Sequence, residues 1–210
     1  METVRRYSGE EYLEVELCGV RRRLPIRKVG EGVWIASDAA LAFGCDTEFT
    51  EAVGRELAWR LARFSPECIL TAEAKSVALA YEVSKDLGLK EYALARKHVK
   101  AYMEEALIEE VRSITTKEPQ LLVLDELNSS RVRGKRVALL DDVISTGGTM
   151  LGLLNLAKKA GAEVCCISAI WLEGPWPWTV FKDWIDGGRL IYLGTLPVYS
   201  ESGALGSTSV

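Results

Sequence analysis

Several classes of protein are excluded by features that this sequence lacks. No apolar run approaches the roughly eighteen residues that a membrane-spanning helix needs, and the opening residues, METVRRYSGEEYLEVEL, contain no apolar core of a signal peptide. No C-x-x-C pair occurs, and one histidine is too few for the usual zinc sites. We therefore expect a cytoplasmic protein with no membrane partner and no structural zinc.

An excess of positive charge is also absent. The chain has 26 Lys and Arg against 30 Asp and Glu, a net charge of -4 at pH 7. Non-specific binding of nucleic acid depends on a basic surface, so we expect no nucleic-acid partner. The five cysteines are an odd number, and Cys165 and Cys166 lie in an apolar run, so we expect reduced, buried thiols.

The length and composition suit one globular domain with a small appendage. The 210 residues are 48% hydrophobic, which is enough for a sizeable core. We expect N-terminal strands over 1–45, a core over 46–171, an aromatic segment with a closing strand over 172–199, and a disordered tail over 200–210.

Apolar runs alternate with helical patterns from residue 68 onward. Strands are predicted at 68–72, 92–96, 121–124, 136–140, 164–171 and 190–196, after three earlier ones at 12–18, 20–26 and 33–36. Helices are predicted over 46–64, 76–87 and 149–160. Strand-helix alternation with continuously apolar strands predicts an α/β fold whose central, mostly parallel sheet is flanked by helices. In such folds, ligands bind at the carboxyl ends of the strands.

Residues 137–149, VALLDDVISTGGT, place two acids and a glycine-rich turn at one such strand end. The glycines and the start of the following helix expose backbone N–H groups, which suits a phosphate. Asp141 and Asp142 would repel that phosphate, but they can accept hydrogen bonds from vicinal hydroxyls or hold a divalent cation. A ribose 5-phosphate carries both features.

Other phosphate-binding loops and an ordinary turn were the alternatives for this segment. The chain contains no G-x-x-x-x-G-K-[ST] loop and no G-x-G-x-x-G fingerprint. A bare acid pair or a bare S-T-G-G would favour a plain capped turn. The full combination in a strand-loop-helix context favours a sugar phosphate site.

The same segment closely resembles the phosphoribosyl pyrophosphate (PRPP) motif of type I phosphoribosyltransferases, in their purine, adenine phosphoribosyltransferase-like branch. The resemblance implies a Rossmann-like fold with a small hood. It also implies that Asp141 and Asp142 are catalytic, and that the ribose and 5-phosphate are bound by Asp141, Asp142, Val143, Ser145, Thr146, Gly147, Gly148 and Thr149.

Two further segments resemble parts of this family. ILTAEAKSVALA at 69–80 resembles the pyrophosphate loop, which implies a cis peptide at Ala74–Lys75, although many purine members have glycine where Ser76 stands. YALARKHVK at 92–100 resembles a basic strand end that reaches the pyrophosphate; a solvated basic end is the alternative, and His98 is interpreted as a bystander. The implied pyrophosphate-binding residues are Glu73, Ala74, Lys75, Ser76, Arg96, Lys97 and Lys100.

The resemblance implies a reaction as well. Ribose 5-phosphate would pass from PRPP to a purine, giving a nucleoside monophosphate and pyrophosphate. Mg²⁺ would be the cofactor, held mainly by PRPP with Asp141 as a candidate ligand, and a homodimer is the expected assembly.

The sequence gives fewer signals for the residues that would bind the base. Residues up to about 43 or the aromatic stretch 171–184 could form the hood, and Trp171 and Trp176 are candidates for the base, although such tryptophans also suit a dimer interface. Residues 101–119 correspond to a mobile catalytic loop, but the spacing of Met103, Leu107 and Val111 also fits a surface helix.

The choice of base and the choice between enzyme and sensor stay open at this point. Adenine is the first candidate, followed by a 6-oxopurine (hypoxanthine, guanine or xanthine) and then by uracil or orotate. A regulator that only senses PRPP is the other class. It would need a DNA-binding module, and the first 45 residues show no helix-turn-helix pattern.

Overall fold

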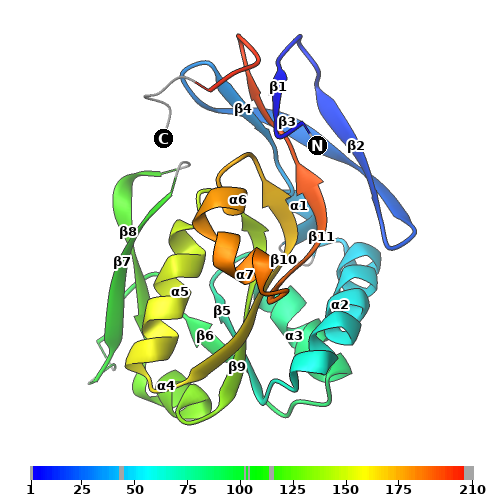
Figure 1. The fold of residues 1–210 in the computed structure, drawn as a ribbon. Helices are drawn as coiled ribbons and strands as arrows, with labels where there is room; N and C mark the ends of the chain where they lie inside the picture. The colour runs from blue at the N-terminus through cyan, green and yellow to red at the C-terminus, as the bar shows by residue number, and fades with distance from the viewer. Residues whose placement is uncertain (1, 43–44, 102, 104, 114–115, 206–210) are drawn as a thin grey trace.

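The computed structural model describes residues 2–42, 45–101, 103, 105–113 and 116–205, and Figure 1 shows how their elements are arranged. The described strands form two five-stranded sheets and a separate two-stranded hairpin. One five-stranded sheet, called the central sheet below, forms the centre of the molecule. The other, called the second sheet, lies at one end of it.

The central sheet contains β5 (Cys68–Ala72), β6 (Ala93–Ala95), β9 (Arg136–Ile144), β10 (Glu163–Glu173) and β11 (Leu190–Leu196), in the order β11-β10-β9-β5-β6. All four pairings are parallel. The strand predicted at 136–140 continues to Ile144, because β10 pairs with it as far as Leu172. Asp141 and Asp142 therefore lie within the last part of β9 rather than after it.

Helices cover both faces of this sheet. One face packs against α2 (Thr47–Leu61) and α3 (Val77–Asp86). The other packs against α4 (Glu126–Val132), α5 (Gly148–Lys159) and the short α6 (Pro177–Val180) and α7 (Lys182–Asp186). Neighbouring residues such as Ile69 and Leu70 belong to opposite cores. The predicted α/β fold with a covered parallel sheet is confirmed.

Local sequence explains where α2 begins. Asp46 is its N-cap, and its Oδ1 accepts a hydrogen bond of 3.0 Å from the backbone N–H of Phe49. The apolar face at Phe49, Val53 and Leu57 is buried as predicted. The helix ends in a short 3₁₀ turn, η1 (Ala62–Phe64).

The second sheet joins the two ends of the chain. Its strands are β1 (Val4–Arg6), β2 (Tyr12–Leu17), β3 (Val20–Gly30), β4 (Val33–Ala36) and β12 (Val198–Ser200), in the order β1-β12-β4-β3-β2. A short helix, α1 (Ala39–Ala42), follows β4. The sequence predicted β2 to β4 but neither β1 nor β12. Ser200 lies in β12, so the tail predicted from residue 200 starts too early; 206–210 lie outside the described residues.

The segment predicted as a loop or a surface helix forms an antiparallel hairpin instead. Its strands are β7 (Leu107–Ser113) and β8 (Thr116–Leu124). Leu107 and Val111 are four residues apart, which places them on one side of a helix or of a strand alike. The hairpin packs on α5 where Gly152 leaves room, since a Cβ there would lie 2.4 Å from Val111 Cγ1. Its catalytic role stays a prediction.

None of the described helices has the length and apolar character that crossing a bilayer requires.

Candidate functional site

A cavity lies at the carboxyl ends of β5, β9 and β10, next to the end of β4. The loop from β9 to α5 forms one wall and the loop from β5 to α3 forms another. Residues 35–38 and Glu173 form a third wall, and the hairpin contributes Val111, Gln120 and Leu122. This is the position that parallel sheets offer to ligands.

The glycine-rich loop borders the cavity as predicted, with Val143, Ser145, Thr146, Gly147, Gly148 and Thr149 all in its lining. Gly147 has φ +91°, and a Cβ there would lie 2.7 Å from Phe181 Cε2, so this position requires glycine. α5 begins at Gly148, so its first N–H groups have no partner within the helix. The Ser145 hydroxyl is buried in this loop and lies near Glu173. The loop thus offers donors to an anion.

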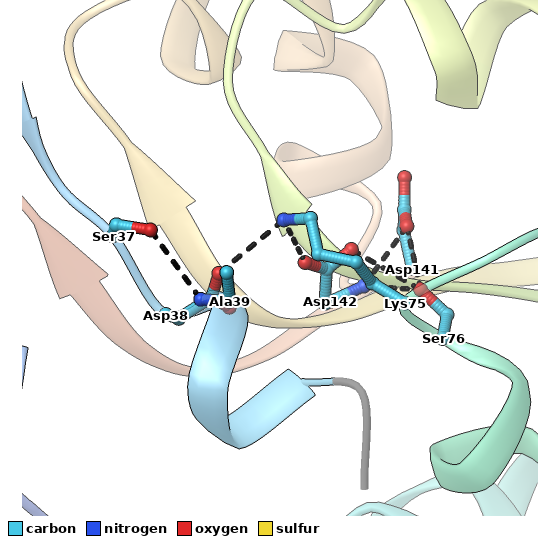
Figure 2. Close-up of polar contacts among 7 residues, drawn as sticks. All are labelled: Ser37, Asp38, Ala39, Lys75, Ser76, Asp141 and Asp142. Carbon is cyan, nitrogen blue, oxygen red and sulfur yellow. Dashed lines mark hydrogen bonds and ion pairs between the residues drawn. The ribbon is translucent and has the colours of Figure 1, made fainter. Parts of the chain in front are cut away.

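The two acids are held by the neighbouring loop (Figure 2). The Ser76 hydroxyl donates to Asp141 Oδ1 at 2.8 Å and accepts from the backbone N–H of Asp142 at 2.9 Å. Lys75 Nζ lies 2.5 Å from Asp142 Oδ2 and 3.3 Å from Asp38 Oδ1. One lysine therefore joins two carboxyl groups from distant parts of the sequence. Together with Ser76, it fixes both acids of the motif in place.

The surroundings shift the pKa values of these two acids in opposite directions. Burial and the charge of Asp142 raise the pKa of Asp141 well above its usual range. Burial also opposes the ionisation of Asp142, but the charge of Lys75 and local hydrogen bonds outweigh it and lower the pKa of Asp142. As the pH rises, Asp142 therefore loses its proton before Asp141 does. The oxygens of both carboxyl groups can accept hydrogen bonds, which suits the hydroxyls of a diol.

The predicted pyrophosphate loop borders the cavity through Glu73, Ala74, Lys75 and Ser76. Its cis peptide is Glu73–Ala74, one residue before the predicted position. Burial opposes the charged form of Lys75, but the charges of Asp142 and Asp38 raise its pKa, so Lys75 stays a cation.

Of the three basic residues predicted to bind pyrophosphate after β6, the structure places one in the cavity lining and two outside it. Lys97 borders the cavity, and its backbone N–H donates to Glu73 Oε1 at 2.6 Å. Arg96 Nε donates to Glu73 Oε2 at 2.9 Å, and neither Arg96 nor Lys100 is in the lining. Their role in binding pyrophosphate stays a prediction.

The two tryptophans predicted for the base do not line the cavity. Trp171 is 3% exposed, and its ring stacks on Phe49 at 6.4 Å between centroids. Trp176 packs over Gly174, where a Cβ would lie 2.6 Å from its ring. Trp171 therefore packs the interior and the half-buried Trp176 covers Gly174, so a purine in the cavity has to contact other residues.

Two acids of the cavity were missed by sequence reasoning. Asp38 follows β4, and Glu173 is the last residue of β10. Burial and the charge of Asp142 raise the pKa of Asp38 to about 6. Burial raises the pKa of Glu173 to about 7, although the nearby Ser145 hydroxyl opposes that change. The strand-end rule that selected Asp141 would have found Glu173.

The described side chains do not make a metal site by themselves. Within the described ranges, no group of three or more His, Cys, Asp or Glu side chains is arranged to hold a metal ion. Asp142 is paired with Lys75, and Asp141 accepts from Ser76. The donor set fits a Mg²⁺ ion whose other ligands come from the substrate, with Asp141 as the candidate protein ligand.

Known proteins resemble this chain in sequence and in fold. A xanthine phosphoribosyltransferase of Chloroflexus aurantiacus is 33% identical over 198 residues, covering 90% of this chain and 87% of its own. That of Geobacillus thermodenitrificans is 27% identical and covers 78% of each chain.

The similar solved structures carry a different base in their names. Adenine phosphoribosyltransferase from Thermoanaerobacter pseudethanolicus matches with a TM-score of 0.59 at 22% identity, over 72% of this chain and 83% of that one. The enzyme from Leishmania tarentolae matches with 0.59 at 24%, over 88% and 83%. At these identities the structures establish the fold. The family model for the phosphoribosyl transferase domain matches residues 42–183, which include the loop, the acid pair and Lys75, and the chain therefore belongs to the type I phosphoribosyltransferase family.

Proposed function

We propose that this protein transfers ribose 5-phosphate from PRPP to a purine. The observation that carries the proposal is the meeting of three features in one cavity: the glycine-rich loop, the acid pair and the Lys75–Ser76 loop. A phosphate, a diol and a pyrophosphate group match them in turn. The products are a nucleoside monophosphate and pyrophosphate, with release of the proton from the purine ring nitrogen.

Each feature has a role in this reaction. The N–H groups at the start of α5 bind the 5-phosphate and fix the sugar. Asp141 and Asp142 bind the ribose hydroxyls and place negative charge near the anomeric carbon, where positive charge develops as its bond to pyrophosphate breaks.

Lys75 has to change partners when PRPP binds. In the free protein it neutralises Asp142 and Asp38, and the arriving pyrophosphate offers it a more concentrated negative charge. When Mg²⁺ is bound with PRPP, it supplies further charge neutralisation for the leaving group.

The base is the finer question, and two candidates have support. The predicted substrate is adenine, and the similar solved structures are adenine phosphoribosyltransferases. The curated relatives are xanthine phosphoribosyltransferases, and one of them exceeds 30% identity. A purine is the common class, so the proposal is stated at that level.

An assay of pyrophosphate release tests the proposal. PRPP and Mg²⁺ are incubated with adenine, guanine, hypoxanthine or xanthine, and uracil and orotate serve as controls. We expect release that depends on one of the purines. Release only with a pyrimidine, or none with any base, would contradict the proposal.

The sensor alternative has its own readout. A DNA mobility shift with and without PRPP would reveal a regulator, and we expect no shift. A homodimer and a cytoplasmic location are further parts of the proposal; sedimentation tests the first and cell fractionation tests the second.

A further inference from the structure

Two carboxyl groups of the cavity have no assigned partner in the proposed reaction. Glu173 is 4% exposed and Asp38 is 3% exposed, and both border the cavity. The Oδ2 atom of Asp38 is buried and has no hydrogen-bond partner among the described residues. Glu173 forms no ion pair with any described residue. The Oδ2 atom of Asp38 is thus a costly buried acceptor, and Glu173 has the Ser145 hydroxyl as its nearby donor, so a ligand is the natural source of further donors.

These acids do not suit the anionic groups of PRPP, and its ribose hydroxyls are already assigned to Asp141 and Asp142. Its 5-phosphate and pyrophosphate are anions, and a carboxylate has only acceptors to offer them. The donors for those anions are at the other walls of the cavity, in the glycine-rich loop and around Lys75 and Lys97. The wall of Asp38 and Glu173 is therefore left for the uncharged reactant, the base. The partly buried Ile35 and the buried Ala36 add apolar surface on the same wall.

The purines differ in what they present to such a wall. Guanine carries an amine beside a ring N–H, which gives a carboxylate two adjacent donors, and adenine carries an amine beside a ring nitrogen that only accepts. Xanthine also has ring N–H groups, but they stand next to two carbonyl oxygens, which a carboxylate repels and which call for a cation or another donor. The cations in the described lining are Lys75 and Lys97. Lys75 is paired with Asp142 and Asp38, whereas Lys97, whose backbone N–H donates to Glu73, lies on the wall that we assign to pyrophosphate.

We propose that Glu173, assisted by the free oxygen of Asp38, accepts hydrogen bonds from the amine of the base and makes this enzyme selective for aminopurines over xanthine. The inference rests on the proposed function and names the substrate class within it. It also predicts that this chain differs from its xanthine-specific relatives in the base that it prefers.

The test compares bases and variants in one assay. Steady-state kcat/KM is measured with adenine, guanine, hypoxanthine and xanthine for the parent, Glu173→Gln and the matched control Glu163→Gln. Glu163 is at the opposite end of β10 and is exposed. We expect kcat/KM of the parent for its best aminopurine to exceed that for xanthine at least thirtyfold. Glu173→Gln should raise KM for that aminopurine at least tenfold and leave KM for PRPP within twofold, whereas Glu163→Gln should change neither.

A second variant helps to distinguish a loss of base binding from a folding defect. Asp38→Asn keeps the size of the side chain and is expected to raise KM for the aminopurine about threefold. Circular dichroism and calorimetric titration with PRPP, applied to every variant, show whether the rest of the site is intact. A variant that binds PRPP normally but loses affinity for the aminopurine supports the assignment.

Two kinds of failure can be told apart. If xanthine is the best substrate of the parent, or if both variants keep the parent's KM for the aminopurine, the assignment of Glu173 and Asp38 is wrong while the proposed function stands. If no purine supports pyrophosphate release although PRPP binds, the proposed function is wrong and the inference is wrong with it.

Discussion

The two five-stranded sheets differ in how they are built and in what they contribute to the cavity. In the central sheet β5 is buried along its whole length, whereas β2 in the second sheet alternates between exposed and partly buried residues. The central sheet and its loops supply the groups that match PRPP. The wall that we assign to the base draws on both sheets, because Asp38 follows β4 of the second sheet and Glu173 ends β10 of the central one. The comparison teaches that the central sheet alone can bind PRPP, whereas the choice of base also depends on the second sheet.

Asp142→Asn is expected to have the largest effect, because it removes the more readily ionised carboxyl group of the acid pair from the central sheet. Turnover should fall about 100-fold, which corresponds to about 2.7 kcal/mol in activation free energy. The melting temperature should change little, because Asn keeps the size of the side chain and Asp38 remains beside Lys75. Turnover and thermal melts of the variant are compared with those of Asp86→Asn, an exposed control. Equal turnover of variant and parent would remove Asp142 from the mechanism.

Lys75→Met tests the cation that joins the two parts of the site. Without Lys75, the buried Asp38 and Asp142 lose their counterion, and we expect the free energy of unfolding to fall by about 2 kcal/mol, less than for a fully buried pair because the lysine side chain is 39% exposed. Loss of the cation also raises the pKa of both acids in the folded state. The deficit should therefore shrink as the pH falls from 8 to 5, because the acids then take up protons.

Urea denaturation at both pH values measures this deficit. Lys85→Met, which removes an exposed surface ion pair, is the matched control and should cost much less. A deficit that is independent of pH would show that packing, rather than charge, explains the loss.

Glu173→Gln tests the base-facing wall through stability alone. The pKa of Glu173 in the folded chain is about 7, above its ordinary value of 4.5. As the pH rises, the unfolded chain therefore releases the Glu173 proton at a lower pH than the folded chain does. The free energy of unfolding of the parent consequently falls between pH 4.5 and 7. The variant has no such proton. It should match the parent near pH 4 and exceed it by roughly 3 kcal/mol above pH 7.

The groups that face Glu173 set the background for this experiment. Asp38 and Asp142 raise its pKa, while Lys75 and the Ser145 hydroxyl lower it. Thermal melts from pH 4 to 8 give the comparison. If the two stability curves run parallel, Glu173 is ionised at the same pH in the folded and unfolded chains, and the wall is wetter than its burial indicates.

A matched pair of small truncations should have the smallest effect and sharpens the comparison of the sheets. Val137 in β9 and Val198 in β12 are both fully buried, so each change to alanine should lower the free energy of unfolding by about 1 to 2 kcal/mol. Val198 pairs with Ile35, which borders the cavity. Val198→Ala should therefore raise KM for the base about twofold, and Val137→Ala should not. The same change in KM for both variants would contradict a separate base-facing wall.

The central sheet could be predicted from the sequence because its signals are local. The bounds of β5 and β11 agree with the prediction, and the loop before α5 carries its glycines and hydroxyls in one continuous segment. Asp141, Asp142 and Lys75 were found for the same reason, since each belongs to a short motif that resembles the family.

The remaining features depend on contacts between distant residues. β12 has three residues and pairs with β1 at the other end of the chain, so no local pattern indicates it. The helical interpretation of residues 103–111 failed because a four-residue spacing also fits a strand. Trp171 and Trp176 were assigned to the base because aromatic rings suit one, but such rings also pack against the protein itself, as Trp171 does on Phe49 and Trp176 on Gly174. Asp38 carries no motif, and although the strand-end rule would have selected Glu173, only the fold brings the two acids to one wall.

The position of β12 has a consequence for how the protein is made. The wall-bearing strand β4 lies between β3 and β12, and β12 is encoded almost at the end of the chain. During synthesis, the residues of the PRPP-facing region leave the ribosome well before β12 does. In the nascent chain β4 can therefore pair with β3 before β12 has been made, and the strand that leads to Asp38 gains its second neighbour only afterwards.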